Sequence, residues 1–263
     1  MQWFIQNSVN SNYIMKRVLL RQFLLSLLFL IPAYVMADAI RVAVASNFSE
    51  PVKEIAARYE QRSGQQLILI FGATGKHYAQ IKHGAPFDIF FAADAQRPRL
   101  LEDEGIAIVG SRFTYALGRL VLWSPREGFV DKQGRILETV QFTRLAIANP
   151  KLAPYGRAAQ EVLQAKGLWQ ALRQRMVRGE NIGQTYQFVK SGNAELGFVA
   201  YSQIKQSNQA VVGSYWLVPQ SLYQPIEQQV ILLKDNPAIR DFITYMQGPE
   251  AQTIIRSYGY DTQ

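Results

Sequence analysis

The sequence contains no cysteine and only two histidines in 263 residues. Without cysteine the chain can form no disulfide, no thiolate metal site and no lipid-anchored cysteine behind an export signal. His77 and His83 lie six residues apart, which turns a helix by about 600° and puts them on different faces. We therefore expect two surface histidines rather than a metal pair or a Ser-His-Asp triad.

Carboxylates with catalytic neighbours are also missing from the sequence. Asp88 and Asp94 lie in and just after a predicted strand, but no histidine or cysteine adjoins them. A metal or nucleophile site needs such partners. The residue pattern does not indicate an enzyme.

Clustered charge is equally scarce. The formal net charge is +8, and it falls to +5 without the three basic residues of the N-terminal 37-residue segment, which holds no acidic residue. No run of five basic residues occurs. Scattered charge is typical of a solvated surface and argues against a nucleic-acid partner.

Only the N-terminal segment contains a long apolar run. "MKRVLLRQFLLSLLFLIPAYVMADAI" begins with Lys16, Arg17 and Arg21 and stays apolar through Ile31. It ends in "VMA", with small residues at the positions that precede a cleavage site. No other run approaches the roughly 20 residues that span a bilayer.

We therefore predict a signal peptide over residues 1–37, cleaved between Ala37 and Asp38, with Met15 as the true start. The 14 residues before Met15 are neither basic nor apolar. An uncleaved membrane anchor is the alternative. Export without a lipid-anchoring cysteine predicts a periplasmic location.

Strand and helix patterns alternate after this segment, in the order strand, helix, strand, helix, strand, helix. Ser49 is the predicted N-cap of the first helix, and Gly64 its stop. Such alternation predicts an α/β fold with a mostly parallel sheet. The predicted elements are strands at 39–45, 67–71 and 87–94 and helices at 50–64, "KHYAQIKHG" and "RPRLLEDEG".

The second half is less regular. Residues 126–141 are polar and predicted to be irregular, and the C-terminal segment reads as two helices broken at Gly248-Pro249. Between these lie predicted strands at 119–125, "RLAIANP", "ELGFVAYSQI", which runs into a helix, and "EQQVILL", and helical segments in "YGRAAQEVLQAKGLWQALRQRM".

The stretch "FGATGK" places a glycine-flanked turn at the start of a helix. Helix N-termini attract phosphate, but a Walker A loop would need glycine where Ile70 stands, and Ser or Thr where His77 stands. A nucleotide loop is therefore excluded. A smaller anion or a plain strand-to-helix turn remains open.

Similar small polar turns recur along the chain. "SNFSEP" and "NPKLAPYG" also follow strands, and "NIGQ" opens a further helix. Ligands of open α/β sheets lie at the carboxyl ends of strands. Four such turns leave two interpretations open, a shared anion site and a purely structural role.

Five motifs in order, spanning residues 39 to 260, resemble the periplasmic molybdate-binding proteins, the substrate-binding subunits of molybdate ABC importers. The resemblance implies a two-lobed type II periplasmic binding protein. Each lobe is a mixed, mostly parallel sheet flanked by helices, and the ligand lies in the inter-lobe cleft. The motifs are "VAVASNFSEPVKEIAARYE", "FGATGKHYAQIKHGAPFDIFFAAD", "LAIANPKLAPYGRAAQEVL", "GENIGQTYQFVKSGNAELGFVAYSQ" and "MQGPEAQTIIRSYGY".

The resemblance implies that the chain crosses between lobes twice. We expect residues 38–117 and 222–263 in lobe 1 and residues 118–221 in lobe 2.

The family's ligand-binding residues carry over motif by motif. They fall on Ser46, Asn47, Thr74, Tyr155 and Ile182. Ser46 and Thr74 supply hydroxyls, and Ile182 a backbone N–H. Tyr155 is expected to act through its phenol or through its backbone N–H.

One branch of the family uses a tyrosine shortly after "LG" in the fourth motif. Aligned through Leu196 and Gly197, that position is Ala200, with Tyr201 one residue further. Tyr201 is therefore left out of the predicted site.

The implied function is capture of molybdate or tungstate for an inner-membrane ABC permease, by a monomer without cofactor, metal or catalytic residues. Neutral donors suit a fully deprotonated oxyanion, whereas the O–H of protonated phosphate would need an acceptor. The alternatives are another oxyanion such as sulfate or a phosphonate, a small organic acid, or a secreted enzyme acting on phosphate esters.

Overall fold

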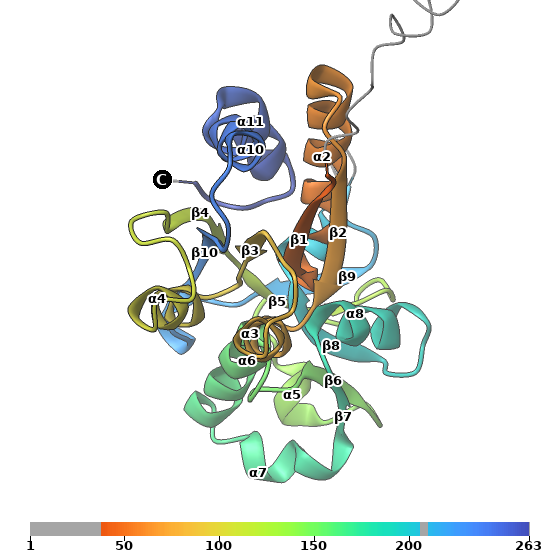
Figure 1. Cartoon of the computed structure of the whole chain (residues 1–263). Helices are drawn as coiled ribbons and strands as arrows, with labels where there is room; N and C mark the ends of the chain where they lie inside the picture. Colours follow the sequence, from red (N-terminus) through yellow and green to blue (C-terminus); the bar gives the residue numbers. More distant parts are fainter. Residues whose placement is uncertain (1–37, 206–209, 263) are drawn as a thin grey trace, which may run out of the picture. The chain divides into compact units, whose positions relative to one another are not determined.

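The computed structural model describes residues 38–205 and 210–262 (Figure 1). The predicted signal peptide over residues 1–37 lies outside the described residues, and the predicted cleavage site lies at their border. Within it, no helix combines the length and the apolar character needed to cross a bilayer.

The first sheet has the strand order β2-β1-β3-β10-β4. β1 pairs in parallel with β2 and β3, and β10 runs antiparallel to β3 and β4. The carboxyl ends of β1, β2 and β3 therefore meet at one edge. The strands are β1 Ile40–Ala45, β2 Leu67–Gly72, β3 Ile89–Phe91, β4 Phe113–Gly118 and β10 Ile226–Leu232.

Helices cover both faces of this sheet. α2, α10 and α11 share a core with one face through residues such as Tyr59, Phe242 and Ile255, and Figure 1 shows α10 and α11 beside each other. α3 and α4 pack on the other face through Ile81 and Leu101. The elements are η1 Ser46–Phe48, α2 Ser49–Ser63, α3 Thr74–Lys82, α4 Gln96–Asp103, α10 Pro237–Gln247 and α11 Pro249–Ser257.

The ends of α2 bear out one prediction and correct another. Gly64 ends the helix in a left-handed conformation (φ 72°) and donates its N–H to the Glu60 carbonyl. Ser49 is not the N-cap. The 3-10 turn η1 runs directly into α2, so Ser49 is its first helical residue and Phe48 takes the cap position without a side-chain hydrogen bond.

The second sheet has the order β7-β6-β8-β5-β9. β6 is parallel to β7 and β8, while β5 is antiparallel to β8 and β9. Both sheets are thus mixed, as expected. The strands are β5 Leu120–Ser124, β6 Leu145–Ala148, β7 Met176–Gly179, β8 Leu196–Ala200 and β9 Ser214–Leu217.

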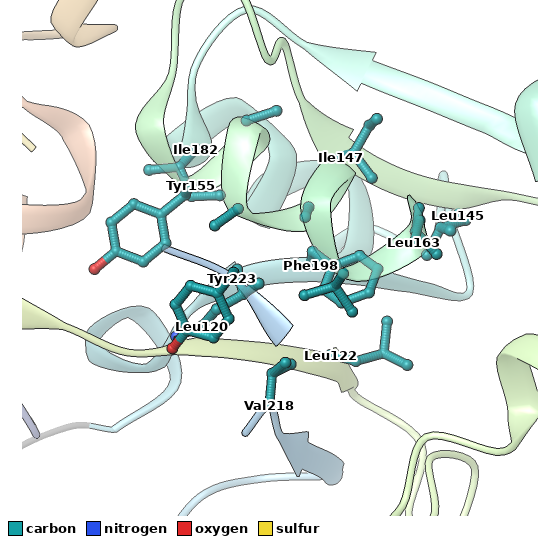
Figure 2. Packing of buried hydrophobic residues seen from close by; sticks show 14 of the residues in the cluster. Leu120, Leu122, Leu145, Ile147, Tyr155, Leu163, Ile182, Phe198, Val218 and Tyr223 are labelled. Carbon is teal, nitrogen blue, oxygen red and sulfur yellow. The ribbon is translucent and has the colours of Figure 1, made fainter. Parts of the chain in front are cut away.

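The second sheet also has a core on each face. Figure 2 shows the larger cluster, to which Leu163 of α6 and Leu122 and Phe198 of the sheet belong. Val189 of α8 joins the cluster on the opposite face. The remaining elements are α5 Ile136–Thr139, α6 Pro154–Ala165, α7 Trp169–Leu172, η2 Arg173–Arg175, α8 Ile182–Lys190, α9 Tyr201–Ile204 and η3 Gln220–Leu222.

The chain passes between the two sheets twice, from β4 to β5 and from β9 to β10. Several short elements were not predicted: β4, β7, β9 and the helix α5, which interrupts the segment 126–141 expected to be irregular. The predicted break between the C-terminal helices is confirmed, since α10 ends at Gln247 and α11 starts at Pro249.

Candidate functional site

Ser46 and Asn47 follow directly on β1, in the turn η1. Both are buried, with exposed fractions of 7% and 2%. Since β1 lies between β2 and β3, the two residues lie at the middle of the edge where the three parallel strands end. Ligands of α/β sheets bind at such an edge.

Thr74 is the first residue of α3, which starts two residues after the end of β2. Its side chain is 1% exposed, and its Oγ1 accepts the Ala93 N–H over 3.1 Å. Because a hydroxyl can accept and donate at once, the Thr74 O–H keeps its hydrogen for another oxygen. Its backbone N–H is one of the first-turn donors that a helix leaves without an internal partner.

The two glycines of "FGATGK" stand where other parts of the chain come too close to leave room for a side chain. A Cβ on Gly72 would lie 2.8 Å from His77 Nε2, and one on Gly75 would lie 3.0 Å from the Leu152 carbonyl oxygen. The Gly75 N–H donates to that oxygen over 2.8 Å. Any larger residue at Gly75 would push α3 away from the segment that follows β6.

His77 is buried, which corrects the prediction of a surface histidine; His83 is exposed, as predicted. The His77 Nε2 lies 3.2 Å from the Val44 carbonyl oxygen, and Nδ1 lies 3.2 Å from Gln80 Oε1. Burial lowers the pKa of His77, outweighing both hydrogen bonds. The ring is a neutral structural group between α3 and β1.

Tyr155 and Ile182 stand at the starts of α6 and α8, the helices that pack on the second sheet. Pro154 opens α6, where a missing N–H costs nothing. The Asn181 side chain caps α8 by accepting the Gln184 N–H over 2.9 Å. The first-turn N–H groups of Tyr155 and Ile182 lack intrahelical acceptors and can bind an anion.

The structure brings all five predicted residues to one small cavity of about 10 Å³. The walls come from the carboxyl ends of β1, β2 and β3 on one side and from the starts of α6 and α8 on the other. No charged side chain lines it. The lining consists of Ala45, Ser46, Asn47, Gly72, Ala73, Thr74, Ala93, Ala153, Pro154, Tyr155 and Ile182.

Ser46 links the two sides of this cavity. Its Oγ accepts the Gly183 N–H over 3.1 Å and donates to Asn181 Oδ1, also over 3.1 Å. Asn181 and Gly183 were not predicted. An Asn directly before the helical pattern "IGQTYQFVK" is a recognisable N-cap signal, but its contact with Ser46 spans 135 residues of sequence.

The phenol of Tyr155 extends away from the hydrophobic cluster of the second sheet (Figure 2). Its hydroxyl lies 3.4 Å from Gln228 Nε2 and fills space that a Cβ on Gly118 would take. Burial raises the pKa of Tyr155 well above its usual value. The hydroxyl is therefore protonated at neutral pH and has a protein neighbour in Gln228.

Other candidate residues lie elsewhere. Tyr201 packs its ring on Tyr215 at 5.8 Å between centroids, and Lys76 pairs with Glu180 (Nζ to Oε1, 2.7 Å). Neither lines the cavity.

The two acidic residues considered in the sequence, Asp88 and Asp94, form ion pairs with basic side chains of the same chain. Asp88 binds Lys234 and Asp94 binds Arg97. Among residues 38–205 and 210–262, no group of three or more His, Cys, Asp or Glu could hold a metal ion.

Comparison with known proteins gives consistent matches. Residues 40–261 match the family described as bacterial extracellular solute-binding protein. The chain is 50% identical over 230 residues to the molybdate-binding protein ModA of Azotobacter vinelandii, covering 86% of this chain and 91% of that one. It is 46% identical to the molybdate-binding protein ModA of Rhodobacter capsulatus, covering 86% and 90%.

A solved structure gives the same result. The periplasmic molybdate-binding protein of Azotobacter vinelandii superposes with a TM-score of 0.82 at 39% identity, over 85% of this chain and 99% of that one.

Proposed function

We propose that this chain, which belongs to the bacterial extracellular solute-binding protein family, captures molybdate or tungstate and delivers it to an ABC importer. The family membership and the fold confirm what the five sequence motifs indicated. The role is that of a binding protein, with the oxyanion as transported ligand and not as cofactor.

The observation that carries this proposal is the composition of the cavity. Thr74 offers a hydroxyl hydrogen that no protein group takes, and Tyr155 and Ile182 offer helix first-turn N–H groups. Ser46 and Asn47 line the same cavity with neutral polar side chains. A hydrogen bond to a charged group contributes about 1.5–3 kcal/mol, and a helix N-terminus about 0.3–1 kcal/mol. Several such donors bind a dianion firmly without any lysine or arginine.

The small size of the cavity restricts the ligand. Pockets for drug-sized organic molecules have volumes of about 300–1,000 Å³, whereas this cavity has about 10 Å³. So small a space favours a compact oxyanion over a larger organic acid. The two relatives that share about half of their residues with this chain are both named molybdate-binding proteins. Among oxyanions, this favours molybdate.

We also infer how the protein works in transport. Residues 38–117 with 222–263 form one lobe and residues 118–221 the other, so the cavity walls belong to both lobes. An anion bound by both walls stabilises the closed state by its differential affinity. The exported chain, freed of residues 1–37 by cleavage after Ala37, acts in the periplasm as a monomer and meets its permease there.

Calorimetric titration of the purified mature protein with molybdate, tungstate, sulfate, phosphate and a phosphonate tests the ligand. We expect molybdate and tungstate to bind more tightly than the others by at least about tenfold, and no turnover of a phosphate ester. Equal or tighter binding of sulfate would overturn the ligand assignment. N-terminal sequencing of the periplasmic protein tests the cleavage site, and a chain that retains Met15 would contradict it.

A further inference from the structure

The buried amide of Asn47 has one atom without a partner. Its Nδ2 donates to Gln228 Oε1 over 2.6 Å and to the Tyr260 hydroxyl over 2.9 Å. Its Oδ1 is fully buried and has no hydrogen-bond partner in the described part of the chain. Asn47 lines the cavity. Because both hydrogen bonds use Nδ2, Oδ1 is the amide atom that remains to face the cavity. A lone carbonyl oxygen there would repel an anion.

Turning the Asn47 amide by 180° exchanges the positions of its oxygen and nitrogen without moving any other atom. In the turned form Nδ2 faces the cavity as a donor. Oδ1 then needs donors on the side of Gln228 and Tyr260. Both residues can supply one.

Gln228 can turn together with Asn47. Its Nε2 would then donate to Asn47 Oδ1, and its Oε1 would face the Tyr155 hydroxyl, now 3.4 Å from Nε2. The Tyr115 hydroxyl, 3.1 Å from Gln228 Oε1 and 3.2 Å from the Ala92 carbonyl oxygen, would donate to Ala92 and accept from Gln228. Every amide group keeps a partner.

Tyr260 completes the arrangement. Its hydroxyl lies 2.9 Å from both Asn47 Nδ2 and the Asn47 carbonyl oxygen. The Ser202 hydroxyl can donate its one hydrogen either to that carbonyl oxygen, 3.0 Å away, or to the Tyr260 hydroxyl, 2.8 Å away. Tyr260 can therefore give its hydrogen to Asn47 Oδ1 while Ser202 satisfies the backbone. Burial raises the pKa of Tyr260 to about 12, so the phenol keeps that hydrogen at neutral pH.

We propose that Gln228 and Tyr260 are positioning residues that hold the Asn47 amide with its N–H toward the bound oxyanion. This inference rests on the proposed function, because it concerns the same cavity. The donor orientation satisfies all the buried amide atoms named above, whereas the opposite orientation leaves Asn47 Oδ1 buried and unpaired, which is unfavourable.

The arrangement also bears on specificity. An amide fixed as a donor rejects an anion that carries an O–H, because that hydrogen would find no acceptor. When Gln228 no longer holds it, the amide can turn and present Oδ1 to such a hydrogen. Loss of the positioning group should therefore narrow the preference for molybdate over hydrogen phosphate.

A double-mutant cycle tests whether Gln228 acts through Asn47. Gln228→Met keeps the length of the side chain and removes the amide. We expect it to raise the molybdate dissociation constant about tenfold in the wild-type background and less than about twofold in an Asn47→Ala background. Gln229→Met is the matched control. The Gln229 amide contacts Arg112 and Thr114 instead, so binding should change less than twofold.

Tyr260→Phe removes a single hydroxyl and keeps the packing, so it provides a second, milder variant. It should weaken molybdate binding severalfold, again only when Asn47 is present. Equal losses in both backgrounds, or no loss in either, would overturn the positioning role while leaving the oxyanion function intact. Failure of the wild-type protein to bind any oxyanion would overturn both.

Discussion

Thr74 and Lys76 offer the sharpest test of a site built from neutral donors. They lie two residues apart at the start of α3, but Thr74 is 1% exposed at the cavity. Lys76 is half exposed and its Nζ lies 2.7 Å from Glu180 Oε1. A charge-based site would depend on the lysine, whereas the proposed site depends on the threonine.

Thr74→Ala removes one hydrogen bond to a charged ligand, worth about 1.5–3 kcal/mol, so the molybdate dissociation constant should rise roughly 10- to 150-fold. Lys76→Ala removes an exposed ion pair worth about 0–1 kcal/mol. Its effect on binding should stay below about fivefold. Calorimetric titration at one pH and ionic strength measures both.

The Thr74 hydroxyl also accepts the Ala93 N–H, so Thr74→Ala leaves a buried donor unpaired and lowers stability as well. Thermal unfolding without ligand separates this loss from the loss of affinity. Thr74→Ser keeps the hydroxyl and should restore most of the binding. If Lys76→Ala were the more damaging change, or Thr74→Ser bound no better than Thr74→Ala, the neutral-donor reasoning would be wrong.

Three further predictions concern the phenol, closure and pH. Tyr155→Phe should change the molybdate dissociation constant less than about threefold, because the hydroxyl adjoins Gln228 and the backbone N–H is the proposed donor; a tenfold loss by titration would assign the phenol to the ligand. Small-angle scattering should show a smaller radius of gyration with saturating molybdate, and an unchanged radius despite binding would contradict the lobe assignment. The lowered pKa of His77 means that the unfolded chain binds a proton first as pH falls, so stability should decline below about pH 6.5. His77→Gln should flatten that decline in thermal unfolding curves, and an unchanged slope would exclude His77 as its source.

Features that depend on neighbouring residues in sequence were predictable. The apolar run of β1, the left-handed stop at Gly64 and the break before Pro249 each follow from a local preference. The five residues of the candidate site were assigned through the resemblance to the molybdate-binding family, and the turns in which they stand could also be recognised from composition alone. Such turns have a recognisable composition.

Features that depend on distant residues were not predictable. His77 has no sequence signal of burial, because its place depends on the bare backbone of Gly72 and on the Val44 carbonyl. Gln228 lies within the strand "IEQQVIL", where one polar residue looks like any other, yet its partner Asn47 is 181 residues away. Hydrogen bonds formed by tertiary pairing leave no local pattern to read.

The size of the cavity depends on residues that do not touch a ligand. Gly75 lets α3 approach the Leu152 carbonyl, and Gly183 lets α8 approach Ser46, where a Cβ would lie 3.1 Å from the Ser46 Cβ. Each contact joins a segment of the first sheet to one of the second. The approach at Gly75 is limited by the Leu152 backbone. The approach at Gly183 is limited by the Ser46 and Asn181 side chains. Both contacts affect how close the donor groups of the two walls can come. On the proposed function, selection of an oxyanion by size would depend on these two glycines as well as on the donor groups.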